Sequence, residues 1–332
     1  MTTHRERIQA CIAGERPDRT PVALWRHFPV DDQDPEQLAA AQVAFQRTFD
    51  FDLVKVTPAS SFCLKDWGAD DAWEGHTEGT RRYTKGVLSG PAEWEKLPVL
   101  DPDKGHLGAQ LACLRSMRAA LGTDTPMLQT VFSPLAQAKH LATNDTLLVH
   151  MRKYPDALLK GLETIARTTR RFVEAAAETG IDGIFYAVQH AQAELLSPDE
   201  FGKFGRVPDL SVLEAAQDLW CNMLHIHGDY VYFDAVADYP VQIINWHDRD
   251  TGPSLTEALA SRAFQGGTAS VLCGGIRRET LALGTAEAVR REAEDAIRQT
   301  GGKQLVLSTG CVVPVIAPYG NFIAARDASV PA

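Results

Sequence analysis

The sequence has 332 residues, of which 45% are hydrophobic and 23% charged, a composition typical of a globular protein with a large buried core. Its formal net charge of -10 argues against nucleic acids and anionic membrane surfaces as partners, because both are bound through clustered Lys and Arg. The sequence contains no run of 18 uncharged apolar residues and no signal-peptide pattern after Met1, so a cytoplasmic protein without membrane contact is expected.

Apolar runs rich in β-branched residues recur along the chain and predict eight strands. In chain order they cover residues 21–25, 53–57, 127–132, 183–188, 222–227, 241–246, 270–274 and 305–309. Intervening stretches such as 145–179 and 280–300 have helical spacing or helix-favouring composition. This alternation predicts an α/β fold, a closed parallel (β/α)8 TIM barrel. An open doubly wound sheet is the alternative, because strand boundaries cannot be fixed from one sequence.

No low-complexity segment or Pro/Gly/Ser-rich linker divides the sequence, so residues 1–332 are expected to form a single domain. Residues 57–103, after the second predicted strand, form a long loop excursion with three tryptophans and little regular periodicity. Loops of this length are often functional lids. A small subdomain that covers the barrel mouth is an equally good interpretation.

The predicted metal ligands are His225, His227 and Cys311. In a strand, residues two apart point to one face, and both histidines end the fifth predicted strand; Cys311 follows the eighth. In a barrel these positions meet at the C-terminal face of the strands. Three such ligands without an obvious fourth are typical of a catalytic zinc that keeps one position open. Alternatively, the histidines are packed or surface residues and the cysteine is unrelated.

The other five cysteines are too dispersed for a disulfide framework and are expected to be reduced thiols, mostly in the core. They are Cys11, Cys63, Cys113, Cys221 and Cys273.

Three more residues at strand ends are candidates for catalytic roles. His190 follows the fourth strand and could be a fourth ligand or a proton carrier, or only a polar rim residue. His247 and Asp248 follow the sixth strand and could orient substrate or hydrogen-bond a ligating imidazole. A solvated turn at Asp248 is the simpler alternative.

Four residues are candidates for substrate binding. Arg26 and His27 follow the first strand and are placed to meet an anionic part of a substrate, although a structural salt bridge is an equally good explanation. Gln189 follows the fourth strand. Cys273 begins a Cys-Gly-Gly stretch whose glycines allow close approach of a cofactor, but Cys273 itself is as well explained by packing.

Motifs along almost the whole chain resemble the uroporphyrinogen decarboxylase superfamily, and within it the zinc-dependent cobalamin methyltransferase branch. The resemblance depends on the order and spacing of seven segments together. They are residues 7–22, 51–56, 177–184, 195–201, 224–228, 307–314 and 317–321.

The decarboxylases of this superfamily bind porphyrinogen carboxylates with two motif arginines, and use an aspartate after the second strand and a histidine after the last. Arg26 matches the first arginine, but Val30 replaces the second. Ala59 stands at the aspartate position and Cys311 at the histidine position. Uroporphyrinogen decarboxylation is therefore the weaker hypothesis.

In the methyltransferase branch, a His-x-Cys pair and a later Gly-Cys bind Zn2+, which activates a thiol to accept a methyl group from a corrinoid. His225 and Cys311 match two of these ligands. The resemblance implies a methylcobalamin-type corrinoid as co-substrate, a small-molecule thiol or other methyl acceptor, and a separate corrinoid carrier protein. A third hypothesis is a non-catalytic member that binds corrinoid, tetrapyrrole or metal.

His227 stands where the family has its second cysteine. Because imidazole is neutral and thiolate anionic, a zinc held by two histidines and one cysteine keeps about one more unit of positive charge. A thiol bound there would ionise more readily, but its thiolate would be less nucleophilic. Such a metal could also activate water or polarise a carbonyl, and a different divalent metal could occupy the site.

Overall fold

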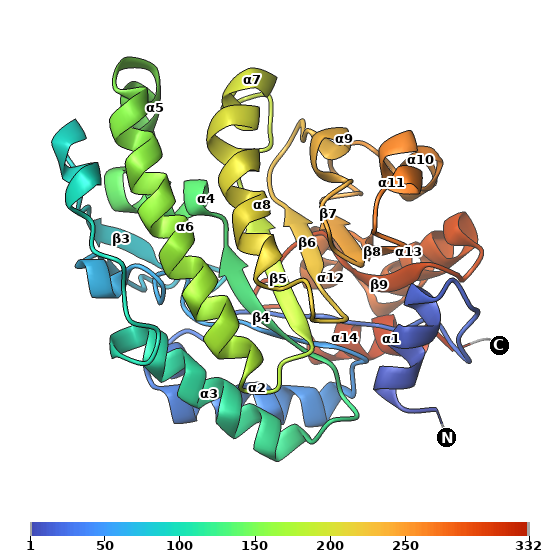
Figure 1. The fold of residues 1–332 in the computed structure, drawn as a ribbon. Coiled ribbons are helices and arrows are strands. Elements are labelled where there is room, and N and C mark those ends of the chain that lie inside the picture. The colour runs from blue at the N-terminus through green and yellow to red at the C-terminus, as the bar shows by residue number, and fades with distance from the viewer. Residues whose placement is uncertain (1, 331–332) are drawn as a thin grey trace.

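The computed structural model describes residues 2–330 and shows an α/β barrel built on one parallel sheet (Figure 1). Seven strands follow one another around the sheet in the order β1-β4-β5-β6-β7-β8-β9. Their bounds are β1 Val54–Val56, β4 Met127–Phe132, β5 Gly183–Val188, β6 Met223–Ile226, β7 Ile243–Trp246, β8 Val271–Ile276 and β9 Leu305–Thr309. The predicted parallel barrel architecture is confirmed.

The eighth barrel position is filled by residues 21–23, which form a single bridge rather than the predicted strand. Ala23 donates its N–H to Leu307 of β9 at 3.0 Å, and Asp52 donates its N–H to the Val22 carbonyl at 2.7 Å. This segment therefore lies between β9 and the chain that enters β1. Regular pairing is interrupted because the Val22 N–H is bound by the Asp52 carboxylate at 2.8 Å and Pro21 has no N–H.

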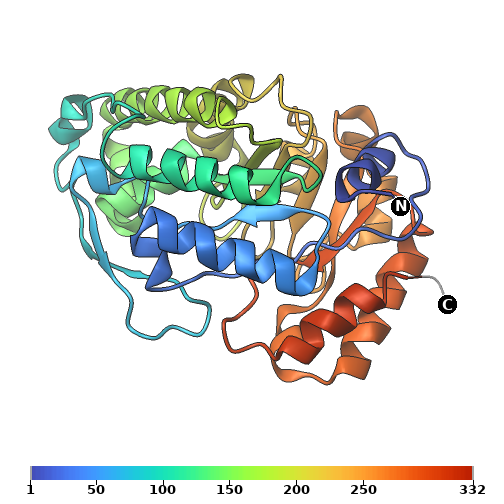
Figure 2. The same cartoon turned by 90° about the horizontal axis from the view of Figure 1, so that it is seen from below.

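Helices surround the sheet, and Figure 2 shows α2, α3 and α6 lying roughly side by side along one flank. The longer helices are α1 His4–Ile12, α2 Pro35–Phe49, α3 Gly105–Leu121, α4 Pro134–Ala142, α5 Asn144–Lys153, α6 Pro155–Ala177, α8 Val207–Glu214, α13 Ala286–Thr300 and α14 Tyr319–Asp327. Shorter ones are α7 Pro198–Glu200, α9 Phe233–Val236, α10 Leu255–Ala260, α11 Arg262–Gly266 and α12 Arg278–Leu283. No helix among residues 2–330 is long and apolar enough to cross a membrane.

Both predicted helical stretches are interrupted once. The stretch 145–179 divides into α5 and α6 because Pro155, the first residue of α6, cannot continue the hydrogen bonding of α5. The stretch 280–300 divides into α12 and α13, where the Thr285 side chain accepts the N–H of Ala288 and starts a new helix.

Strand alternation divides the core into an interior and an outer layer. On β6, Met223 belongs to the cluster that fills the barrel, whereas Leu224 and Ile226 pack under the helices. His225 therefore points inward, one layer above Met223. The register pairs His225 with Asn245 of β7, and Asn245 with Cys273 of β8. One interior layer near the C-terminal ends of the strands is thus polar.

The excursion between β1 and α3 holds a small antiparallel sheet, β2 Asp70–Ala72 with β3 Arg82–Lys85, and two short 3-10 helices, Lys65–Trp67 and Pro91–Lys96. Its tip reaches the loops after β8 and β9: Glu78 pairs with Arg278 at 2.6 Å, and the Thr77 carbonyl accepts the N–H of Val315 at 2.7 Å. The Tyr83 ring stacks on His140 of α4, with 4.1 Å between ring centroids. The excursion therefore crosses the C-terminal face of the barrel.

Candidate metal centre

Four side chains converge at the C-terminal face of the barrel. One potential ligand atom from each of His225, His227, His247 and Cys311 lies within 4.8 Å of the others. Cys311 Sγ is 3.6 Å from His225 Nε2 and 3.7 Å from His227 Nδ1. The structure thus brings the three predicted ligands together, and adds His247 to them.

The spacing of these atoms fits a zinc ion. Zinc bonds of about 2.3 Å to sulfur and about 2.0 Å to nitrogen, at a tetrahedral angle, place the two ligand atoms about 3.5 Å apart. The sulfur of Cys311 lies at 3.6 and 3.7 Å from the two imidazole nitrogens. In addition, His247 Nε2 is buried and has no hydrogen-bond partner among the described residues. The donor set therefore suits a metal that prefers nitrogen and sulfur.

Cys311 differs electrostatically from the other thiols. Burial alone raises the pKa of a thiol, as it does to about 12 for Cys11 and Cys63. At Cys311 burial acts in the same direction, but the neighbouring imidazoles, His225 first, hold the pKa well below its usual value. Since the thiolate is the form that binds metal, Cys311 is the sulfur suited to this role.

The backbone around Cys311 explains the Gly-Cys pair. A Cβ atom at Gly310 would lie 2.6 Å from the His247 Cα atom and 2.7 Å from the Trp246 carbonyl oxygen. Only glycine lets the chain after β9 pass this close to the end of β7. Thr309 Oγ1 also donates to the Cys311 carbonyl at 2.6 Å. These contacts fix where the Cys311 side chain enters the cluster.

A cavity of about 270 Å³ opens above the cluster and includes His225, His227 and Cys311 in its lining. Aromatic side chains, among them Trp25 and Phe185, form an apolar wall, and the excursion contributes a second wall. The excursion residues in this wall are Pro58, Ser60, Glu78, Thr80, Arg81 and Tyr83. The volume suits a small substrate.

Lys55 is a buried amine in this cavity that sequence analysis did not single out. It lies at an inward position of β1, and its Nζ is 4.7 Å from the centre of the Phe185 ring. Among residues 2–330, its Nζ has no carboxylate partner and lies over the Phe185 ring instead. Burial lowers the pKa of Lys55 to about 7. The signal that could have found it is a lysine between two valines in a strand that is otherwise apolar.

Two of the four predicted substrate-binding residues, His27 and Gln189, line the cavity. The Gln189 side chain accepts from Lys139 Nζ at 3.0 Å. Burial first, and then the charge of Lys55, lower the pKa of His27 to about 3, so this ring is neutral at pH 7.

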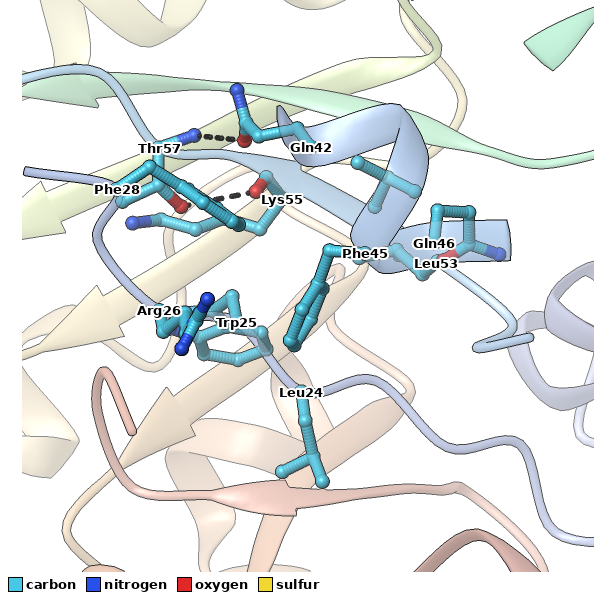
Figure 3. A pocket seen from close by; sticks show the side chains of 11 residues that line it. Leu24, Trp25, Arg26, Phe28, Gln42, Phe45, Gln46, Leu53, Lys55 and Thr57 are labelled. Atoms are coloured by element: carbon cyan, nitrogen blue, oxygen red, sulfur yellow. Dashed lines mark hydrogen bonds between the residues drawn. The ribbon is translucent and has the colours of Figure 1, made fainter. Parts of the chain in front are cut away.

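Arg26 and Cys273 lie outside the cavity lining. Figure 3 shows a different pocket, in which Arg26 lies beside Phe28 and Phe45. The Arg26 guanidinium carbon is 5.2 and 5.5 Å from the centres of these two rings. Arg26 also donates to the Val315 carbonyl at 3.4 Å, which is a structural contact; its contact with substrate stays a prediction. Cys273 is fully buried in the barrel interior.

His190 and Asp248 are not among the four side chains of the candidate ligand cluster. Both ring nitrogens of His190 are buried without a partner in the described chain, and the ring is not among the four clustered ligands. Asp248 accepts the Gly275 N–H with both carboxylate oxygens at 3.1 Å, and within residues 2–330 it makes no hydrogen bond to an imidazole. Burial raises the pKa of Asp248 to about 6. The side chain that does bind a candidate ligand is Asn245, whose Oδ1 is 2.7 Å from His225 Nδ1.

The family model described as uroporphyrinogen decarboxylase (URO-D) matches residues 3–329. The chain belongs to the uroporphyrinogen decarboxylase family. Two members of similar sequence are both named methylcobamide:CoM methyltransferase MtaA and both come from Methanosarcina barkeri. They are 22% and 24% identical to this chain, and each match covers 98% of this chain and 98% of the relative. The predicted resemblance to this superfamily and its methyltransferase branch is confirmed.

Solved structures show the same fold. A methyltransferase from Methanosarcina mazei has a TM-score of 0.85 at 20% sequence identity, and the match covers 99% of this chain and 98% of the methyltransferase chain. A B12-independent methionine synthase from Shewanella sp. W3-18-1 has a TM-score of 0.58 at 14% identity, over 89% and 86% of the two chains. At these identities the likeness concerns the fold.

Proposed function

We propose that this chain is a zinc-dependent methyltransferase that moves a methyl group between a corrinoid and a thiol or similar acceptor. The observation that carries the proposal is the convergence of Cys311 Sγ with His225 Nε2 and His227 Nδ1 at distances that suit zinc, below an open cavity. The names of the two Methanosarcina barkeri relatives, which pair a methylcobamide with CoM, support the same chemistry.

Bound zinc would supply a positive charge that favours ionisation of an acceptor thiol beside it. In this proposal His225, His227 and Cys311 hold the metal. His247 is close enough to be a fourth ligand, whereas a site held by three protein ligands would keep a position for the acceptor. The apolar Trp25 wall keeps water away from the anionic sulfur and so preserves its reactivity.

His227 makes the proposed site different from one with two cysteines. A neutral imidazole leaves about one more unit of positive charge on the metal than a thiolate does. We therefore expect this site to react faster with acceptors of higher thiol pKa than a site with two cysteines would. The extra positive charge ionises such a thiol, and its thiolate is still a strong nucleophile.

The corrinoid would have to approach from the barrel mouth. The cavity of about 270 Å³ has room for a small acceptor but not for a corrin macrocycle. We propose that a separate carrier protein presents the methylated corrinoid at this opening, with only the methyl group reaching the sulfur of the acceptor.

Lys55 points to an acceptor with a negative group. Its side chain is 6% exposed and lies in the same cavity as Cys311. The charged form of this amine is costly to bury without a carboxylate partner, and an anionic group of the substrate would stabilise it. The acceptor we propose is therefore a small thiol that carries a carboxylate, sulfonate or similar anion.

Lys55→Met is expected to lower the rate with anionic thiols by about 10- to 100-fold, since a hydrogen bond to a charged group contributes about 1.5–3 kcal/mol. The measurement is kcat/KM with 3-mercaptopropionate and with 2-mercaptoethanol, which differ in charge at one end. Little change is expected for the neutral thiol. Equal losses with both thiols would show that Lys55 does not recognise the acceptor.

The proposed activity is tested by metal analysis followed by an assay of methylcobalamin demethylation. We expect about one zinc per chain and loss of methylcobalamin that depends on an added thiol, with water and tetrahydrofolate as comparison acceptors. A chelator should abolish the reaction and zinc should restore it. Bound metal without turnover would instead support a binding role, and full activity of metal-free protein would exclude the proposal.

A further inference from the structure

Asn245 is a fully buried amide at the centre of the polar layer beneath the metal cluster. Its Nδ2 donates to the carbonyls of Cys273 at 2.8 Å and Thr309 at 3.0 Å, and its Oδ1 lies 2.7 Å from His225 Nδ1. One side chain on β7 therefore touches β6, β8 and β9.

The two carbonyl partners determine which way the amide faces. A backbone carbonyl only accepts, so the NH2 group must point toward Cys273 and Thr309, and the oxygen must point toward His225. Because that oxygen only accepts, His225 must carry a proton on Nδ1. In the neutral ring that binds a metal, the lone pair of His225 then lies on Nε2, the atom that is 3.6 Å from Cys311 Sγ.

The same amide also holds the turn that carries Cys311. Thr309 is the last residue of β9, and its carbonyl is one of the two acceptors of Asn245. The Thr309 hydroxyl in turn donates to the Cys311 carbonyl. Movement of Asn245 would therefore disturb both the histidine and the cysteine of the cluster.

We propose that Asn245 is a positioning residue that fixes the Nδ1–H tautomer of His225 and holds the Cys311 turn in register with it. The role in zinc binding rests on the proposed function, whereas the tautomer of His225 does not. Nothing in the role requires Asn245 to touch the metal or a substrate. Outer hydrogen-bond partners of this kind typically change metal affinity by about 10- to 100-fold.

Asn222 provides a matched control at the other end of the barrel. It is also buried, donates from Nδ2 to the carbonyls of Ala216 and Leu219 at 2.8 and 3.2 Å, and accepts the N–H of Ile184 at 3.0 Å. Its hydrogen bonds are equal in number, but none involves a candidate ligand. A purely structural role would make the two asparagines equivalent.

The first experiment measures zinc affinity by competition with a chromophoric chelator for the wild type, Asn245→Leu, Asn245→Asp and Asn222→Leu. We expect a loss of about 10- to 100-fold for Asn245→Leu. Partial recovery is expected in Asn245→Asp, which keeps the acceptor, and near-wild-type affinity in Asn222→Leu. Equal affinity in the wild type and a folded Asn245→Leu, or an equal loss in both Leu variants, would overturn the inference.

The second experiment follows the His225 tautomer in metal-free protein by 1H–15N spectra of histidine-labelled samples. We expect the Nδ1–H form in the wild type and in Asn222→Leu, a retained Nδ1–H form in Asn245→Asp, and its loss in Asn245→Leu. A wild-type ring with its proton on Nε2 would overturn the inference even if zinc binds. Wild-type protein that shows the Nδ1–H form but binds no zinc would overturn only the proposed function.

Discussion

Cys311→Ser is expected to lose bound zinc and to lower the rate of methyl transfer from methylcobalamin by more than about 100-fold. Loss of a hydrogen-bond partner of a ligand lowers activity by up to about 100-fold, and loss of a ligand itself should lower it further. The replacement removes the sulfur that lies 3.6 and 3.7 Å from two imidazole nitrogens. A serine hydroxyl does not ionise near neutral pH, so it is a poor substitute for a thiolate ligand. Zinc content and the rate of methylcobalamin demethylation are measured on the same preparation.

The matched control for this variant is Cys11→Ser. Cys11 is also buried but lies on α1, in the interior cluster and far along the chain from the ligands, with its thiol 3.7 Å from the Leu305 carbonyl. We expect this variant to keep zinc and activity. If Cys311→Ser retained both, or if the two variants lost them equally, Cys311 would not be a metal ligand.

Asp52→Ala is expected to lower the free energy of unfolding by about 3–5 kcal/mol, the usual effect of removing one partner of a buried ion pair. The Asp52 carboxylate is fully buried and accepts from Arg7 at 2.6 Å, Arg19 at 2.6 Å, His4 at 2.9 Å and the Val22 N–H at 2.8 Å. It therefore joins α1 to the segment that closes the barrel. Urea denaturation measures the effect, and Glu74→Ala, which breaks an exposed pair with Arg82, should change stability little.

The stabilisation from Asp52 should depend on pH. Burial opposes the charged form, but hydrogen bonds from His4 and the charge of Arg19 lower the pKa of Asp52 below its ordinary value. A carboxylate with a lowered folded pKa stabilises the protein above its unfolded pKa, and that contribution is lost as the pH falls through the folded pKa. The gap between wild type and Asp52→Ala should therefore be large at pH 7 and shrink in acid. A gap that widens in acid would contradict this role.

Strand positions were predictable where apolar runs are bounded by glycine or polar residues, as at β4, β5 and β9, whose bounds equal the predicted ones. The segment 21–25 is apolar because it is buried in the barrel, as a strand would be. It does not form a regular strand because the Asp52 carboxylate accepts the Val22 N–H. That interaction joins residues thirty positions apart, and no local pattern contains it.

The candidate site was predictable in part for a similar reason. Alternation along one strand places His225 and His227 on one face, and the glycine before Cys311 indicates a strand end. The closeness of His247, and the hydrogen bond that His225 Nδ1 donates to Asn245, depend instead on the register between β6 and β7. A single sequence gives the side-chain period of each strand but not this register.

The most direct test of the metal centre is zinc K-edge X-ray absorption on the purified protein, together with its zinc content. The structure predicts about one zinc per chain, bound by one sulfur at about 2.3 Å and two or three nitrogens at about 2.0 Å. Stoichiometric zinc without a sulfur ligand, or protein that binds no zinc when it is supplied, would contradict a metal centre at His225, His227 and Cys311.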